Sequence, residues 1–154
     1  MAGQEGHADA LNILAETKAD LSTPRNNSGT AAFMAAQNGH ADCLKILAEA
    51  KVNLSTPCDN GATPAFIAAQ KGHADCLKIL VEAKSDLSTS RNDGTTPAFM
   101  AAQKGHADCL KILAEAKANL STPRSDGVTL AFIAAQKDHA DCLRILAVNQ
   151  LATF

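Results

Sequence analysis

The stretch AAQKGHADCLKIL at residues 68–80 decides the fold of this chain, because it returns unchanged at residues 101–113. Copies with one and two changes stand at residues 35–47 and 134–146. The histidines of the chain recur every 33 residues: His7, His40, His73, His106 and His139. A fixed period of this length predicts a stack of small, nearly identical units.

Composition narrows the class of protein and of partner. The chain has 154 residues, of which 46% are hydrophobic and 19% are charged, and its formal net charge is -2. These values are typical of one compact globular unit. Nucleic acid is not an expected partner, because the chain lacks both a basic excess and any Trp or Tyr for base stacking.

Neither a membrane nor an oxidising compartment is indicated. The first residues, MAGQEGHADA, do not combine a cationic segment with an apolar run, and no run reaches the roughly 18 apolar residues of a membrane helix. Four of the five cysteines recur inside periodic apolar segments, unlike the cysteines of a disulfide framework. The sequence therefore predicts a cytoplasmic protein with free thiols.

The segment at residues 92–123 predicts two short helices preceded by a turn. Thr96 is a favourable N-cap, and Pro97 suits the first helical position after the turn formers Asn-Asp-Gly. Gly105 suits the left-handed conformation that ends a helix, and a second helix with an apolar face follows His106. Both helices are shorter than the roughly 12 to 15 residues needed for independent stability, so they must pack on neighbouring units.

Each unit places a histidine three residues before a cysteine, as in His106 and Cys109. Two such ligands are only half of a tetrahedral zinc site. Equivalent residues of the next unit should lie about 10 Å away, which is too far for bonds of about 2.3 Å. No acidic residue recurs in a position to orient the histidine against the thiol. We therefore expect a buried core cysteine and a structural histidine, with no metal, no cofactor and no catalytic site.

The 33-residue spacing, the segment TPAF and the following AAQKGH resemble the ankyrin repeat, whose usual Thr-Pro-Leu-His becomes Thr-Pro-Ala-Phe here. The resemblance covers almost the whole chain. It implies an all-α ankyrin-repeat solenoid of stacked helix-turn-helix units with β-turn fingers, forming a single domain over residues 1–154. The implied units are a half-repeat at 1–24, full repeats at 25–57, 58–90 and 91–123, and a C-terminal repeat at 124–154.

The chain departs from the family pattern after each second helix. Lysine stands where the family has a glycine, at Lys18, Lys51, Lys84 and Lys117. The resemblance implies a positive φ at these positions. A residue with a side chain adopts that conformation at a cost of about 1 kcal/mol.

The resemblance also implies where a partner binds, namely on a concave surface formed by the finger tips and the first helices. The copies vary most at the finger tips, although surface loops drift in the same way without any partner. Polar residues at the ends of the first helices form a second candidate group, for which solubility is the competing explanation. The candidate partner-binding residues are Asn60, Asp93, Thr95, Asp126, Gln70, Lys71, Gln103, Lys104, Gln136 and Lys137.

Two further charge patterns have a less specific interpretation. Charges of alternating sign along the second helix are typical of a solvated back surface: Asp108, Lys111, Glu115 and their equivalents. Arg25, Arg91 and Arg124 form a row near the base of the fingers, interrupted by Cys58. This row either binds acidic segments of a partner or consists of ordinary surface arginines.

The sequence thus favours a non-catalytic protein–protein interaction scaffold whose partner is an unidentified protein. Two alternatives stay open. One is a consensus-like or engineered repeat array without a natural ligand, because residues 66–98 and 99–131 differ at only eight positions. The other is a structural module that self-associates through its apolar C-terminal end, where the last helix adds Val148, Leu151 and Phe154. A tail folded over that helix would cover the same surface.

Overall fold

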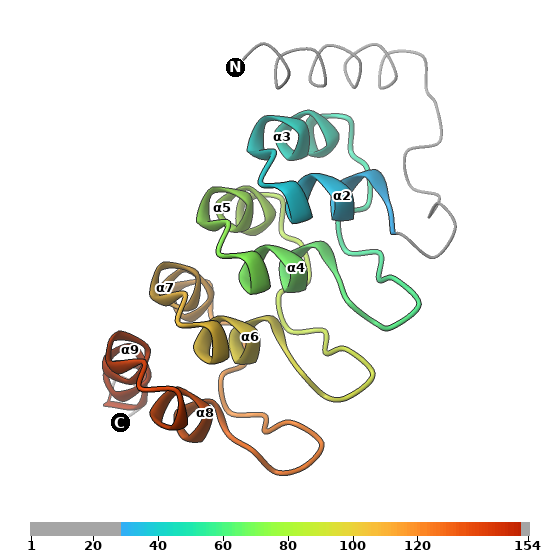
Figure 1. Cartoon of the computed structure of the whole chain (residues 1–154). Helices are drawn as coiled ribbons and strands as arrows, with labels where there is room; N and C mark the ends of the chain where they lie inside the picture. The colour runs from blue at the N-terminus through green and yellow to red at the C-terminus, as the bar shows by residue number, and fades with distance from the viewer. Residues whose placement is uncertain (1–28, 152–154) are drawn as a thin grey trace.

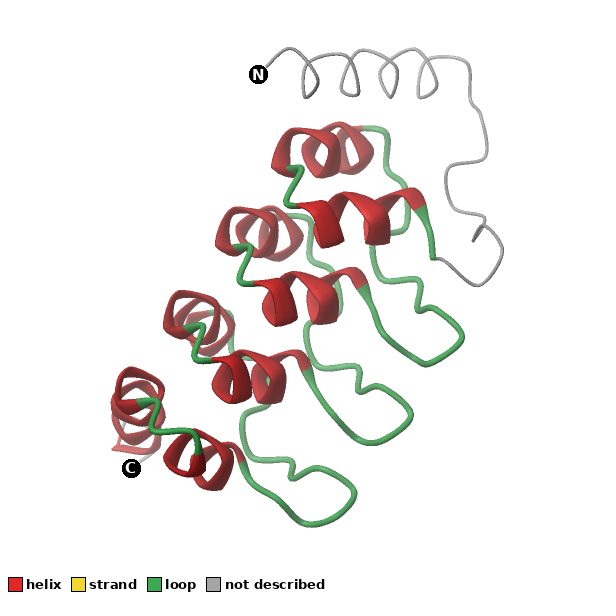
Figure 2. Cartoon of the chain, viewed as in Figure 1, coloured by secondary structure: helices red, strands yellow, loops and turns green. Residues whose placement is uncertain are grey.

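The computed structural model describes residues 29–151, in which helices are the only regular elements (Figures 1 and 2). The helices follow one another as α2 (Ala31–Asn38), α3 (Ala41–Glu49), α4 (Pro64–Lys71), α5 (Ala74–Glu82), α6 (Pro97–Lys104), α7 (Ala107–Glu115), α8 (Leu130–Gln136) and α9 (Ala140–Leu151). The fold is therefore the expected all-α solenoid. The half-repeat predicted at residues 1–24, together with Lys18 and Arg25, lies outside the described residues.

The helices form four antiparallel pairs that stack in two layers (Figure 1). The inner layer contains α2, α4, α6 and α8, and the outer layer contains α3, α5, α7 and α9. Each helix packs on its partner in the pair and on the equivalent helix of the next pair. The loops between pairs project to one side of the stack as a row of fingers (Figure 2). The inner helices and the fingers therefore run along the same side of the molecule.

Local sequence sets the bounds of the inner helices as expected. The Thr96 hydroxyl accepts a hydrogen bond from the Phe99 backbone N–H at 3.1 Å, and Pro97 takes the first helical position. Gly105 ends the helix with a φ of 77°. The same threonine cap begins the other inner helices, at Thr30, Thr63 and Thr129. Because the cap satisfies an otherwise unpaired backbone donor, each is worth about 1 kcal/mol.

The outer helices end at the lysines predicted to have positive φ. Lys51, Lys84 and Lys117 have φ values of 58°, 56° and 60°. After α7, the N–H groups of Lys117 and Ala118 donate to the carbonyls of Ala114 and Leu113 at 3.0 Å, which closes the helix end. The prediction is confirmed at the three described positions. The hydrogen-bonded turn persists despite the roughly 1 kcal/mol cost of a side chain there.

The core is made of small and branched apolar side chains where adjacent pairs meet. The alanines of α4 and α6 are buried where the inner helices meet, as are the two leucines of each outer helix in the first three pairs. Small residues let the inner helices approach closely, while leucines fill the space between the layers. The four cysteines of the repeated motif are also buried, and all five cysteines of the chain are free thiols. The predicted core role of these four cysteines is confirmed.

The histidines join one pair to the next. The Nε2 atom of His106 lies 3.1 Å from the carbonyl oxygen of Gln70 in the preceding pair, and His73 reaches Gln37 in the same way at 3.2 Å. A carbonyl oxygen can only accept, so the ring nitrogen donates. His139 uses Nδ1 instead and reaches Ala102 at 2.8 Å. The predicted structural histidine is thus an inter-pair hydrogen-bond donor.

The glycines that end the inner helices make room for these histidines. A Cβ added at Gly72 would lie 2.8 Å from the ring of His106, and one added at Gly39 or Gly105 would meet the next histidine equally closely. These glycines therefore meet two demands, a positive φ and space for an imidazole from the following pair. We call this contact the glycine–histidine contact.

The two demands can be separated by substitution. Gly127 in the last finger also has a positive φ, of 85°, but a Cβ there would meet nothing within 4 Å. We expect Gly127→Ala to cost about 1 kcal/mol of unfolding free energy, from backbone strain alone. Gly72→Ala should cost about 1 to 3 kcal/mol more, because its methyl group displaces the His106 ring. Urea unfolding followed by circular dichroism measures both values.

A double variant provides the control for this experiment. His106→Ala removes the ring that the Gly72→Ala methyl group would displace. The loss of unfolding free energy caused by His106→Ala should therefore be smaller in the Gly72→Ala background than in the wild-type chain. Equal losses for the two glycine variants, or strictly additive losses in the double variant, would contradict the role assigned to the glycine–histidine contact.

Burial also predicts the order in which the thiols react. Burial raises the pKa of Cys109 to about 12 and that of Cys76 to about 11. Cys58, on a finger, is half-buried and its pKa is raised by burial and by the nearby Asp59. Because the thiolate is the reactive form, we expect Cys58 to be alkylated first at pH 8 and Cys109 last, as resolved by peptide mass spectrometry. All five should react at similar rates in urea, and a uniform rate in the native protein would disprove the burial order.

Candidate binding surface

Each described finger is a tight turn closed by backbone and side-chain hydrogen bonds. In the finger of residues 91–95, Arg91 N–H donates to the Thr95 carbonyl at 2.8 Å, and Gly94 N–H donates to the Arg91 carbonyl at 2.9 Å. The Asp93 Oδ1 atom accepts from Thr95 N–H at 3.0 Å. Asn60 and Asp126 cap their fingers in the same way, at 2.9 and 3.2 Å. Three of the candidate residues therefore hold the turns in shape.

Neighbouring fingers are also bonded to one another. Asn92 N–H donates to the Asn60 carbonyl at 3.0 Å, and Ser125 N–H donates to the Asp93 carbonyl at 3.3 Å. The Asn92 side chain adds a contact to the Asp59 carbonyl at 3.3 Å. These bonds fix the spacing of the finger tips. The row of tips behaves as one surface rather than as independent loops.

The arginines at the base of the fingers cover phenylalanines of the preceding pair. The guanidinium of Arg91 lies 5.5 Å from the centre of the Phe66 ring, and that of Arg124 lies 5.1 Å from the centre of Phe99. Each arginine also forms an ion pair within its own finger, Arg91 with Asp93 and Arg124 with Asp126. Both charges are therefore already engaged in cation–π and ion-pair contacts. This favours a structural role over the binding of acidic segments.

The arginines also lower the pKa values of the aspartates in their fingers. The guanidinium of Arg91 holds the pKa of Asp93 well below its usual range, with further help from the Thr95 N–H. The pKa of Asp126 is lowered by its hydrogen bond from Arg124. The hydrogen bonds from the arginines lower both pKa values because they stabilise the charged form of each carboxylate. The candidate surface thus keeps paired charges at its tips.

The second candidate group lies at the C-terminal ends of the inner helices. Lys71 and Lys104 are the last residues of α4 and α6, and Lys137 follows α8 as its C-cap. All three lysines are exposed, as is Gln136, whereas Gln70 and Gln103 are half-buried. The backbone carbonyl of Gln70 already accepts a hydrogen bond from His106, so the side-chain amide of Gln70 is the group available to a partner. These residues repeat with the stack and lie in equivalent positions.

Thr95 does not belong to the accessible surface. Its residue exposure is 3%, because it lies behind the finger tip and directly before the Thr96 cap. Its N–H bonds to Asp93 and its carbonyl bonds to Arg91. The inclusion of Thr95 among the partner-contacting residues was therefore wrong, because closing the turn carries it inward. The other nine candidate residues are exposed or half-buried.

The outer helices carry exposed charges of both signs, as the alternating pattern predicted. Lys78 lies 3.7 Å from Asp75, and Arg144 pairs with Asp141 across one turn. Asp108, Lys111 and Glu115 of α7 are exposed. Exposed pairs of this kind contribute at most about 1 kcal/mol each. The outer face is a solvated back.

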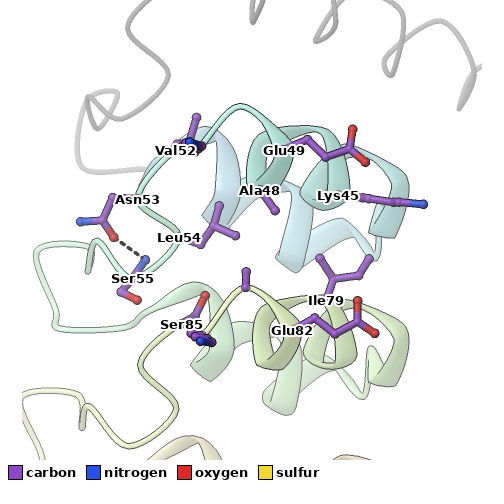
Figure 3. A pocket seen from close by; sticks show the side chains of 13 residues that line it. Lys45, Ala48, Glu49, Val52, Asn53, Leu54, Ser55, Ile79, Glu82 and Ser85 are labelled. Carbon is purple, nitrogen blue, oxygen red and sulfur yellow. Dashed lines mark hydrogen bonds between the residues drawn. The ribbon is translucent and has the colours of Figure 1, made fainter.

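A groove of about 600 Å³ crosses this back between the C-terminal ends of α3 and α5 (Figure 3). Ala48, Leu54 and Ile79 form its apolar floor, and the carboxylates of Glu49 and Glu82 lie on the same side of it. The remaining charged lining consists of Lys45, Lys51 and Lys84. Because these charges nearly balance, the groove does not select a ligand by charge, and we do not include it in the candidate surface.

The groove also contains a buried polar atom without a partner. The Ser85 hydroxyl makes no hydrogen bond among the described residues. The next pair has Ala118 at the equivalent position, and the preceding pair has Val52.

Sequence reasoning missed the contacts that cross from pair to pair. It identified the histidines and arginines as recurring residues but did not assign their partners, which lie 25, 36 or 37 positions earlier in the chain. One signal was present in the sequence, because a histidine directly follows the glycine that ends α2, α4 and α6. The partner of a side chain across a stack requires the stacking geometry, which is absent from the sequence pattern.

Between residues 29 and 151, no three His, Cys, Asp or Glu side chains lie close enough together to hold a metal ion. In the same part of the chain, no helix combines the length and hydrophobicity needed to cross a bilayer.

Comparison with known proteins identifies one family. A family model described as ankyrin repeats (3 copies) matches residues 1–91 and 83–152. A search of the curated proteins gives no match. The family match agrees with the 33-residue period and with the stacked helix pairs.

The ion pair of the central finger predicts a pH response. Arg91→Gln should raise the pKa of Asp93 toward the ordinary value of about 3.9, because the neutral amide no longer stabilises the carboxylate. The wild-type pair stabilises the folded state above about pH 4, and this contribution is lost as pH falls through the folded pKa of Asp93. Nuclear magnetic resonance titration of the Asp93 carboxyl carbon measures the shift.

The control is Arg91→Lys, which keeps a positive charge and should retain part of the lowered pKa of Asp93. Acidification from pH 5 to pH 2 should then destabilise the wild-type protein more than Arg91→Gln. An Asp93 titration that is the same in wild type and Arg91→Gln would contradict the assigned ion pair.

Proposed function

The chain belongs to the ankyrin repeat family, and we propose that it is a non-catalytic scaffold that binds a partner protein through the finger tips and inner-helix ends. We call these positions the concave surface. It contains Asn60, Asp93, Asp126, Gln70, Lys71, Gln103, Lys104, Gln136 and Lys137. Ankyrin repeats are generally protein–protein interaction modules, and we propose that the partner of this chain is a protein.

The observation that carries this proposal is the hydrogen-bonded row of fingers. Each tip is closed by its own Asx-type contact and is joined to the next through Asn92 or Ser125. A surface whose backbone is already fixed loses little conformational entropy when a partner binds. Exposed loops that are held in register by a scaffold are also a common place for binding residues.

The inner-helix ends support a partner with acidic groups at the contact. The helices α4, α6 and α8 contain no Asp or Glu, and Lys71, Lys104 and Lys137 are exposed at or just after their last residues. None of these three lysines has an ion-pair partner among the described residues. Unpaired charges are free to steer and orient an oppositely charged partner.

The back of the stack is the less favourable surface. Its lysines and glutamates are long, exposed side chains that would have to be ordered and desolvated on binding. One of these lysines, Lys78, already lies close to an aspartate, Asp75. We therefore use the back as the internal control for the concave surface.

We also propose that the protein works in the cytoplasm, where thiols stay reduced. The five cysteines are all free, and four of them are buried in the core. Oxidation of a buried thiol would require the stack to open.

Two matched triple variants test the concave surface. Lys71→Glu, Lys104→Glu and Lys137→Glu reverse three charges on the concave surface, and Lys45→Glu, Lys78→Glu and Lys111→Glu reverse three on the back. We expect proteins captured by the wild type to be captured equally by the back variant. The concave variant should bind them about tenfold more weakly, which corresponds to about 1.4 kcal/mol. Quantitative mass spectrometry of the captured proteins, followed by titration calorimetry with the strongest one, measures this.

Both triple variants change the net charge equally. A general effect of charge would therefore weaken the binding of captured proteins to the same degree in both variants. Loss of binding only in the back variant would contradict the surface assignment while leaving the fold intact. Capture of no protein by the wild type would favour the alternative of a repeat array without a natural ligand.

A further inference from the structure

A row of alternating amide and ammonium groups runs along the C-terminal ends of three inner helices. Each of α4, α6 and α8 has a glutamine and then a lysine at this end, with the lysine of α8 as its C-cap. We call this set the Gln–Lys row, and it consists of Gln70, Lys71, Gln103, Lys104, Gln136 and Lys137. The row offers one amide and one unpaired cation per helix pair, among the residues that the structure describes.

The row begins at α4 and does not include the inner helix before it. There α2 ends with Gln37 and Asn38, and the Asn38 side-chain amide donates to the Met34 carbonyl of its own helix at 2.9 Å. Asn38 carries no charge, and its side chain is bonded within α2. The described stack therefore has three equivalent lysine positions, on α4, α6 and α8.

The spacing of the row follows from the packing of the inner helices. Packed helices lie about 8 to 10 Å apart, and the buried alanines of α4 and α6 allow a close approach. His106 and His139 bond to carbonyls near the end of the preceding inner helix, at 3.1 and 2.8 Å. The helix ends are thus held in equivalent positions. The backbones of successive lysines in the row lie about 8 to 10 Å apart.

A partner segment that follows the row must present acidic side chains on one face at this spacing. In a β-strand, residues on one face are about 6.6 or 13 Å apart, which is too short or too long. In an α-helix they are about 5 Å apart, or about 10.5 Å when seven residues separate them. In polyproline II, every third residue lies on the same face, about 9.3 Å from the last. Polyproline II matches the row best.

The glutamines also favour polyproline II over a helix. A helix bonds its backbone groups internally, except at its ends. Polyproline II has no internal hydrogen bonds, so its N–H and C=O groups are free to bond to a partner. The side-chain amide of glutamine offers both a donor and an acceptor. One glutamine beside each lysine can therefore bond to the backbone at each turn of such a segment.

The helix ends attract an anion despite the helix dipole. The C-terminal end of a helix carries about half an elementary negative charge, which the full charge of each lysine outweighs. The helices α4, α6 and α8 contain no Asp or Glu. The ion-paired Asp93 and Asp126 lie in fingers, which adjoin the opposite ends of these helices, about 12 Å away. Asp138 directly follows Lys137, so the positive charge is strongest at Lys71 and Lys104.

We propose that the Gln–Lys row binds an acidic segment in the polyproline II conformation that carries Asp or Glu at every third residue. The three lysines pair with three carboxylates of the segment, and the three glutamines bond to its backbone. A segment of about seven residues fills the row. This inference rests on the proposed function, because it specifies the class of partner for one part of the concave surface.

Two fluorescein-labelled peptides of equal length, composition and charge test the spacing. The peptide PEPPEPPEP places its glutamates at every third residue and therefore on one face, whereas PPPEEEPPP points them in three directions. Proline favours polyproline II in both peptides. In fluorescence anisotropy at about 50 mM salt, the wild-type protein should bind PEPPEPPEP about tenfold more tightly than PPPEEEPPP.

Matched single variants assign the contacts. Lys104→Gln removes the central charge and should weaken the binding of PEPPEPPEP about threefold. Gln103→Ala removes a bond to the peptide backbone and should weaken its binding by a similar factor of about three. Lys111→Gln changes the same charge on the back of the same helix pair and should leave the affinity unchanged. Thermal unfolding by circular dichroism checks that all three variants are folded.

Equal affinity for the two peptides, including no measurable binding of either, would overturn the inference. Tighter binding of an alanine-rich helical peptide with glutamates seven residues apart would also overturn it, because the row would then recognise a helix. Tighter binding of an oligothymidylate of equal charge would show that the row recognises negative charge alone.

The charge-reversal variants Lys71→Glu, Lys104→Glu and Lys137→Glu decide the proposed function separately. If captured proteins depend on these lysines while the two peptides bind equally, the concave surface is correct and only the polyproline II geometry is wrong. If captured proteins do not depend on these lysines, the proposed function itself fails.

Discussion

The glycine–histidine contact is the constraint on which the stack depends. The helices of each pair have eight or nine residues in the first three pairs, too few to be stable alone, so each pair exists only through its neighbours. The imidazole donates to a carbonyl at the end of the preceding inner helix, and the glycine there leaves space for the ring. Together with the alanines and leucines buried between the pairs, this contact joins each pair to the next.

Repetition of the same sequence has different effects on the finger side and on the face of the last helix pair. Along the finger side, equivalent residues of successive pairs bond to one another, as Asn92 does to Asn60, and the surface becomes rigid. At the C-terminal end, the residues that elsewhere fill an interface face outward, as Phe132 does. Equivalent residues of different repeats can therefore be buried in one repeat and exposed in another. Phe66 and Phe99 are buried by the pair that follows each of them, whereas Phe132 has no following pair among the described residues and is exposed.

The candidate surface was only partly predictable because its residues have two roles. Asn60, Asp93 and Asp126 were selected as variable tip residues, and they also accept the hydrogen bonds that close the turns. Thr95 was selected for its position in the sequence, but the turn carries its side chain into the protein. The sequence allows Arg91 and Arg124 to be either a row that binds acidic segments or ordinary surface arginines, and it does not show their phenylalanine and aspartate partners. A loop residue's neighbours across the stack lie in a different repeat, and sequence spacing does not specify the angle at which repeats meet.

The sequence by itself determined the period, the all-helical class and the bounds of the inner helix α6. Thr96, Pro97 and Gly105 act on backbone groups within a few residues of themselves, so their effect can be derived from local chemistry. The apolar spacing likewise identified the four buried cysteines. Only the tertiary structure decided that His106 bonds to Gln70, that Arg91 covers Phe66, and that Phe132 is left exposed. These are contacts between units, and they depend on how one rigid pair is placed on the next rather than on any local preference of the chain.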